Sequence, residues 1–189
     1  MVGKGIRKTC HRWDTPWQAH ELTFSCLRRQ AFLSRQRTRQ YMAAAIQRAR
    51  RAKGFHVWGY VIMPEHVHLL LWPACETYAT SSILQAIKQP VARRAIRWLK
   101  TANPCGLQHL ATGDARKPYR FWQAGGGFDR NVRSGEAPAN MLTYIHENPV
   151  RRGLVKQAED WIWSSAADWA DVRAGPVVID KESFLASLA

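Results

Sequence analysis

Two histidines separated by one residue could chelate a metal ion in this 189-residue chain. His66 and His68 lie in an apolar segment that predicts a β-strand, where residues i and i+2 project from one face and Val67 points into the core. Two imidazoles on one face can bind a single ion. The same pattern also occurs in zinc hydrolases and as two hydrogen-bonded histidines, so the pair alone leaves both interpretations open.

A second candidate group lies on a predicted helix near residue 146. Tyr144 and Asn148 are spaced i and i+4, so they share one helix face, whereas His146 points elsewhere. A purely structural alternative is that Asn148 is an N-cap, with Pro149 at the first position of a following turn. Tyr144 would then be a half-buried aromatic side chain.

Combined, the two groups suggest phosphodiester chemistry. A tyrosine hydroxyl can attack a phosphodiester when a metal ion polarises the phosphate and helps to expel the leaving group. Two neutral imidazoles and an amide carbonyl leave the ion its full charge, and histidine plus oxygen ligands with open positions suit Mg²⁺ or Mn²⁺. The aryl phosphodiester keeps the energy of the broken bond, so a DNA 3′-hydroxyl could attack it. We therefore expect an enzyme that transfers DNA strands.

The charge distribution indicates a polyanionic partner. The net charge is +14, and residues 22–64 contain nine Lys or Arg and no acid. Such one-sided charge favours nucleic acid, because each neutralised phosphate releases a counterion. An anionic membrane surface is a minor alternative. The candidate DNA contacts are Arg28, Arg29, Arg35, Arg37, Arg39, Arg93, Arg97, Arg151 and Arg152.

The elements that must position these residues follow from hydrophobic periodicity. The predicted strands are residues 21–27, 55–63 and 66–72, with a short hairpin formed by 119–122 and 128–132 around Gly125-Gly126-Gly127. The predicted helices are residues 34–52, 81–99 (kinked or divided at Pro90) and 138–148.

This order of elements predicts an α+β fold of the ferredoxin-like (split βαβ) type, with an antiparallel sheet, helices on one face and the other face open for a site. We expect one domain over residues 1–156 and an acidic C-terminal extension over 157–189, which holds two basic and six acidic residues. The extension could cover the basic surface as a brake on DNA binding, or simply pack as an extension anchored by Trp161 and Trp163.

No apolar run is long enough for a membrane span, and the N-terminus lacks the apolar stretch of a signal peptide, so we expect an intracellular protein.

Two segments resemble a known family. Tyr60-Val61-Ile62-Met63-Pro64-Glu65-His66-Val67-His68-Leu69-Leu70-Leu71 is similar to the HUH motif of single-strand tyrosine transposases. The segment 144–155, Y-I-H-E-N-P-V-R-R-G-L-V, resembles the catalytic-tyrosine segment of REP-associated tyrosine transposases. Weaker similarities at 23–26, 121–123, 129–130 and 163–166 extend the resemblance over roughly residues 20–170, in the family order.

The resemblance implies a metal-dependent endonuclease and strand transferase. It would cleave and rejoin single-stranded DNA next to hairpin-forming REP-like palindromes, and Tyr144 would form a 5′-phosphotyrosine. His66 and His68 would bind Mg²⁺ or Mn²⁺, with Asn148 as third ligand. The resemblance also implies a bacterial protein of the cytoplasm, associated with the nucleoid, that is a monomer or a homodimer.

Two departures and two competing functions accompany this resemblance. Glu65 stands where the family usually has Asn, and Gly125-Gly126-Gly127 replaces bulkier residues. Neither removes a catalytic group, so we expect activity to be retained.

A catalytically retired hairpin-binding or RNA-binding protein would share the basic surface and the fold without needing His66 or Tyr144. A zinc hydrolase would need a third ligand and a general base that the sequence does not supply.

Overall fold

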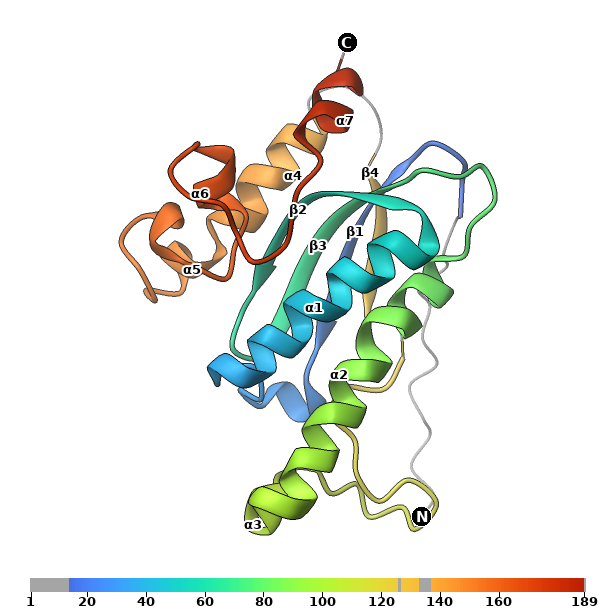
Figure 1. The fold of residues 1–189 in the computed structure, drawn as a ribbon, viewed down its shortest axis with the longest axis vertical. Coiled ribbons are helices and arrows are strands. Elements are labelled where there is room, and N and C mark those ends of the chain that lie inside the picture. Colours follow the sequence, from blue (N-terminus) through green and yellow to red (C-terminus); the bar gives the residue numbers. More distant parts are fainter. Residues whose placement is uncertain (1–13, 126, 133–136, 189) are drawn as a thin grey trace, which may run out of the picture.

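Four antiparallel strands form the centre of the computed structural model, which describes residues 14–125, 127–132 and 137–188 (Figure 1). The strands are β1 (Ala19–Ser25), β2 (Phe55–Ile62), β3 (His66–Pro73) and β4 (Phe128–Val132), in the sheet order β2-β3-β1-β4. The ferredoxin-like α+β prediction is confirmed, and the strands lie within two residues of their predicted bounds.

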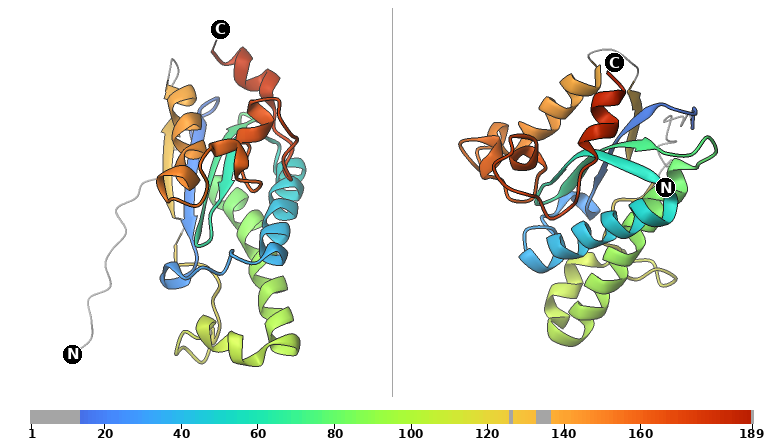
Figure 2. Two further views of the ribbon diagram at one scale, coloured as in Figure 1. Left: turned by 90° about the vertical axis from the view of Figure 1, so that its left-hand side faces the viewer. Right: turned by 45° about the horizontal axis from the view of Figure 1, so that its top comes forward.

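Two long helices, α1 (Gln36–Lys53) and α2 (Thr80–Ala102), cover one face of the sheet (Figure 2). Their apolar residues, including Ile46 and Ile87, share a buried cluster with Leu22, Val67 and Leu69 of the strands. Because side chains alternate along a strand, Val67 enters this core and His66 and His68 face the opposite side. α2 is not divided at Pro90, since residues on both sides of the proline pack into the same core.

The opposite face is not fully open as predicted, because α4 (Ala137–His146) packs on it (Figure 2). Met141, Leu142 and Ile145 of α4 contact the second buried cluster of the sheet. Gly59 of β2 permits this close packing, since a Cβ atom there would lie 2.2 Å from Leu142 Cδ1. The sequence pattern did not reveal this contact, because an amphipathic helix does not specify which sheet face it covers.

The predicted hairpin around the glycines is wrong. β4 pairs with β1, with Thr23 opposite Phe128, and residues 119–122 form only isolated bridges, of which one joins Cys26 to Trp122. β4 can form backbone hydrogen bonds along more of β1 than along the four residues 119–122. Gly127 allows the tight approach, because a Cβ atom there would lie 2.1 Å from the Thr23 carbonyl oxygen. Gly126 lies outside the described residues.

The remaining helices are short. They are α3 (Pro104–Leu107), α5 (Asn148–Arg151), α6 (Ala166–Trp169), α7 (Lys181–Ala186) and three 3-10 turns at Leu27–Arg29, Gln108–Leu110 and Ala158–Asp160. No helix in the described part of the chain has the length and apolarity needed to cross a membrane.

The C-terminal segment lies along the free edge of β2. The Ile62 amide donates to the Trp163 carbonyl, and the Ser165 amide donates to the Tyr60 carbonyl. Further on, the Asp180 carboxylate accepts from the Val57 amide and pairs with Arg50. These contacts protect an exposed sheet edge and favour the packed-extension interpretation over the brake.

Candidate active site

The paired histidines lie at the start of β3, on the face covered by α4. His66 Nε2 and His68 Nε2 are 3.1 Å apart, with the two ring planes inclined at 82°. Both side chains are buried. Strand alternation therefore brings the two imidazoles together as the sequence predicted.

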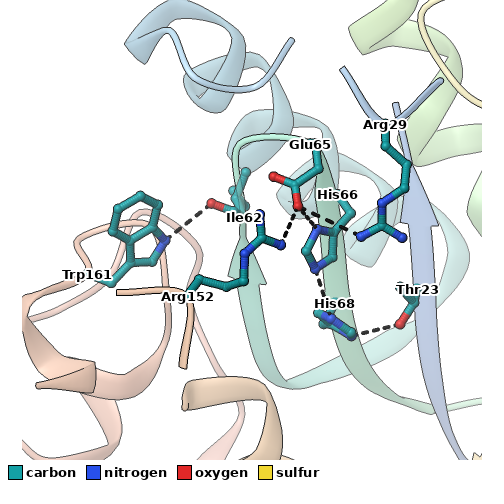
Figure 3. A network of polar contacts seen from close by, with 8 residues as sticks. All are labelled: Thr23, Arg29, Ile62, Glu65, His66, His68, Arg152 and Trp161. Atoms are coloured by element: carbon teal, nitrogen blue, oxygen red, sulfur yellow. Dashed lines mark hydrogen bonds and ion pairs between the residues drawn. The ribbon is translucent and has the colours of Figure 1, made fainter. Parts of the chain in front are cut away.

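A carboxylate holds the outer nitrogen of the His66 ring (Figure 3). Glu65 Oε1 lies 3.0 Å from His66 Nδ1 and also accepts from Arg152 Nη1 at 2.8 Å, and Arg29 Nη2 is 3.9 Å away. Burial raises the pKa of Glu65, but the Arg152 hydrogen bond and the nearby positive charges outweigh it, so this pKa lies below its usual value. The charge of Glu65, which the sequence left unexplained, is thus compensated by arginines.

The second histidine is held by residues of β1 that the sequence analysis missed. His68 Nδ1 lies 2.7 Å from Thr23 Oγ1 and 3.1 Å from Glu21 Oε1. Glu21 is only 4% exposed. Burial raises its pKa, but the hydrogen bonds from His68 and Thr23 outweigh this effect, so the pKa of Glu21 lies below its usual value. An acid in an apolar strand, two residues from a threonine on the same face, was the signal that could have revealed this group.

These contacts leave the Nε2 atoms of both histidines on the inner side of the pair. Two adjacent ligands of an octahedral ion at about 2.1 Å lie about 3.0 Å apart, so the pair has the spacing of two metal ligands. Outer carboxylates that fix the imidazole orientation are the usual partners of metal-bound histidines. Burial lowers the pKa of His66 to about 4, which keeps this ring neutral as a ligand must be.

The tyrosine lies beside the histidine pair. The Tyr144 ring is 5.9 Å from the His68 ring, centroid to centroid, and is 46% exposed. The guanidinium of Arg151 lies 4.2 Å from the Tyr144 ring centroid and donates to the Tyr144 carbonyl oxygen. The structure therefore brings together two groups that are 76 positions apart in the sequence.

Asn148 is the first residue of α5, directly after the tyrosine helix α4. Its Nδ2 donates to the Tyr144 carbonyl at 3.0 Å, and within the described residues it makes no hydrogen bond to either histidine. The N-cap alternative is wrong, because Glu147 occupies the cap position of α5 and Asn148 donates rather than accepts.

α4 is fixed to the sheet by the segment that follows it. His146 Nε2 and Ser165 Oγ are hydrogen-bonded at 2.8 Å, and Ser165 Oγ also accepts from the Tyr60 amide at 2.9 Å. Burial lowers the pKa of His146 to about 4. His146 is thus a structural residue that points away from Tyr144, as expected.

A groove of about 760 Å³ opens beside the tyrosine. Its lining includes His68, Tyr144, Phe128, Arg130 and Asn140. Phe128 is half exposed, so an aromatic surface and a cation lie next to the nucleophile candidate. Tyr144 is therefore accessible from this groove.

The nine candidate arginines fall into two groups. Arg29, Arg151 and Arg152 contact site residues, as described above. The others lie elsewhere: Arg28 donates to the Ala111 carbonyl, Arg35 and Arg37 line a cavity between α1 and α2, Arg39 lies over Trp161, and Arg93 and Arg97 are exposed on α2.

A zinc-hydrolase site is not formed in the described part of the chain, which contains no group of three or more His, Cys, Asp or Glu placed to hold a metal ion. The two nearest carboxylates, Glu21 and Glu65, contact the outer Nδ1 atoms and so do not complete a ligand set at Nε2.

Comparison with known proteins gives one family match. The family model described as "Transposase IS200 like" matches residues 17–114, which include both histidines but not Tyr144. Two curated relatives are similar: the REP-associated tyrosine transposase of Escherichia coli (strain K12), 29% identical over 127 residues, and a putative one of Haemophilus influenzae (strain Rd), 26% identical over 111 residues. The alignments cover 67% and 59% of this chain but only 63% and 58% of those proteins.

The fold has a counterpart among solved structures. A REP-associated tyrosine transposase solved in complex with a REP hairpin superimposes with a TM-score of 0.66 at 22% identity, and the match covers 92% of each chain. Because the match covers 92% of this chain, that similarity extends beyond the range of the family match.

Proposed function

The chain belongs to the IS200-like transposase family, and from that premise we propose that it cleaves and rejoins single-stranded DNA next to hairpin-forming, REP-like palindromes. The relatives named as REP-associated tyrosine transposases, one of them solved with a REP hairpin, support this substrate. The single observation that carries the proposal is the half-exposed Tyr144 ring beside the histidine pair.

Tyr144 is the proposed nucleophile. Its hydroxyl oxygen attacks the phosphorus atom of a scissile phosphodiester, the bond to the 3′ oxygen breaks, and the phenol proton leaves while the departing 3′ oxygen gains one. The product is a 5′-phosphotyrosine and a free 3′-hydroxyl. Attack by another 3′-hydroxyl on this ester reverses the same bond changes and joins two strands without further energy.

His66 and His68 are the proposed ligands of Mg²⁺ or Mn²⁺, with Asn148 as a third ligand. The 3.1 Å spacing of the Nε2 atoms and the carboxylates behind both rings support this assignment. When bound, the ion would polarise the phosphate and favour departure of the 3′ oxygen. Asn148 would need its oxygen turned toward the histidines, because its nitrogen now bonds to the Tyr144 carbonyl.

Arginines around the site have separate proposed roles. Arg151, stacked on the Tyr144 ring, can pair with a phosphate oxygen at the point of attack. Arg152 and Arg29 compensate the Glu65 charge, so that the buried carboxylate does not repel the DNA backbone. In the adjoining groove, Phe128 offers a face on which an unpaired base can stack.

A trapping assay tests the proposal. Purified protein, Mn²⁺ and a hairpin with single-stranded flanks should give a protein–DNA adduct that survives denaturing electrophoresis. Tyr144→Phe should abolish the adduct, and His66→Ala, His68→Ala or a chelator should reduce it strongly. Hairpin binding that is insensitive to chelator, with no cleavage of any hairpin tested, would instead support a catalytically retired binding protein.

A further inference from the structure

A second cavity lies on the other side of the sheet, and the proposed reaction does not use it. Its volume is about 550 Å³, within the range of ligand sites. It is bounded by the connection after β1, the start of α1, the C-terminal half of α2, and α3. These segments lie in the lower half of the molecule in Figure 1.

Aromatic side chains from four separate segments form the walls. Phe32, Tyr41 and Trp98 are partly exposed, and Phe121 is 2% exposed beneath Phe32, with a ring distance of 5.4 Å. Partly exposed aromatic rings around one space favour a planar ligand, because stacking needs flat faces on both partners.

The rim of the cavity is cationic. Arg35 and Arg37 line it, and the described residues around it include no Asp or Glu. The Arg37 guanidinium lies over the Trp98 ring, 3.9 Å from its centroid, and the Arg94 guanidinium lies over the Tyr41 ring at 4.2 Å, so cations stack on the aromatic wall itself. Such a site suits a planar group that carries an adjacent anion.

The cavity is joined to the candidate active site through the backbone. The Cys26 amide donates to the Glu65 carbonyl and the Leu33 amide donates to the Pro64 carbonyl, both at 2.8 Å. The connection after β1 therefore packs against the turn that precedes His66. Arg29 of this connection approaches Glu65, and Phe32 lines the cavity.

We propose that this cavity binds an unpaired nucleotide of the same DNA that reaches Tyr144. Its base would insert among Phe32, Tyr41 and Trp98, and its phosphate would pair with Arg35 or Arg37. The inference rests on the proposed function, because it takes single-stranded DNA as the ligand. It adds a second point of recognition, which would fix the distance between the bound unpaired base and the cleavage site.

Photocrosslinking tests the placement directly. A hairpin oligonucleotide carries 5-iodouracil at one unpaired position at a time, and Tyr144→Phe protein keeps it uncut. We expect a crosslink from a restricted set of positions to the peptides that contain Tyr41 or Trp98, identified by mass spectrometry. Crosslinks confined to other peptides, such as the one with Phe128, would overturn the proposal.

Affinity measurements on variants provide an independent test. Trp98→Ala should weaken oligonucleotide binding by roughly 5- to 100-fold, as expected for loss of base stacking, and Trp98→Phe should restore most of it. Arg35→Ala/Arg37→Ala should weaken binding more than the matched pair Arg48→Ala/Arg51→Ala, which removes equal charge from exposed positions of α1. Equal effects of the two pairs would leave only general electrostatics and refute the site.

Two further arms separate the possible failures. Free dTMP and an unlabelled oligonucleotide are compared as competitors at equal nucleotide concentration. If both reduce the crosslink equally, the ligand is a free nucleotide and the inference about DNA fails. Adduct formation at Tyr144 without a crosslink rejects the cavity and leaves the proposed function standing. A crosslink without any adduct rejects the endonuclease and retains the cavity as a DNA site.

Discussion

Ser165 tests whether the C-terminal segment positions the tyrosine helix. Its side chain is fully buried and hydrogen-bonded to the Tyr60 amide and to His146 of α4. Ser165→Ala would leave the buried Tyr60 amide and the partly buried His146 ring without their partner. At about 1–3 kcal/mol for each of the two unsatisfied groups, we expect a loss of about 2–6 kcal/mol in the free energy of unfolding.

The adjacent serine supplies the control. Ser164 is equally buried, but its hydroxyl accepts a hydrogen bond from the Ala166 amide, and among the described residues no hydrogen bond joins it to α4. Ser164→Ala should therefore cost about 1 kcal/mol. In thermal unfolding, Ser165→Ala should lower Tm by about 5–15 °C, and Ser164→Ala by less than about 5 °C.

Activity distinguishes positioning from stability alone. At a temperature where both variants are folded, Ser165→Ala should slow adduct formation by about 10- to 100-fold, because small displacements of a nucleophile are costly. Ser164→Ala should keep the wild-type rate. If Ser165→Ala costs no more stability and no more rate than Ser164→Ala, the segment does not position α4 and the reasoning is refuted.

Three other predictions follow from charge and packing. Burial holds the pKa of His146 near 4, against about 6.5 in the unfolded chain, so only the unfolded state binds the extra proton as pH falls from 6.5 to 4. Over that range, urea unfolding should show the free energy of unfolding of wild type falling by up to about 3 kcal/mol relative to that of His146→Gln. Glu65→Leu should weaken Mn²⁺ affinity, measured by titration calorimetry, by about 10- to 100-fold, and Glu65→Gln by less, since Gln still accepts from His66; unchanged affinity in both would remove its orienting role. Truncation after residue 170 removes the Asp180 contacts with β2 and should lower Tm without raising cleavage, whereas a faster truncated protein would support the brake.

The sequence predicted most of the elements because their signals are local. Alternation of apolar residues defined β2 and β3, and the same alternation placed His66 and His68 on one face. Helical spacing placed Tyr144 on a helix. These features depend on residues within a few positions of one another, and each was confirmed.

The long-range contacts were beyond that reasoning. Nothing near residue 128 shows that β4 pairs with β1. Glu21 stands out as an acid in an apolar strand, but nothing near it identifies His68 as its partner, because strand register sets both contacts. Likewise, the sequence did not reveal that Ser165 joins β2 to α4. Such partners follow from how the chain folds back on itself, for which a single sequence carries no local signal.

The most direct test of the account is to identify the amino acid that carries the DNA. The adduct formed with Mn²⁺ and a hairpin substrate would be digested with protease and nuclease, and the modified peptide sequenced by mass spectrometry. We predict a nucleotide joined through its 5′ phosphate to Tyr144. Attachment to any other residue, or DNA cleavage with no covalent adduct at all, would contradict it.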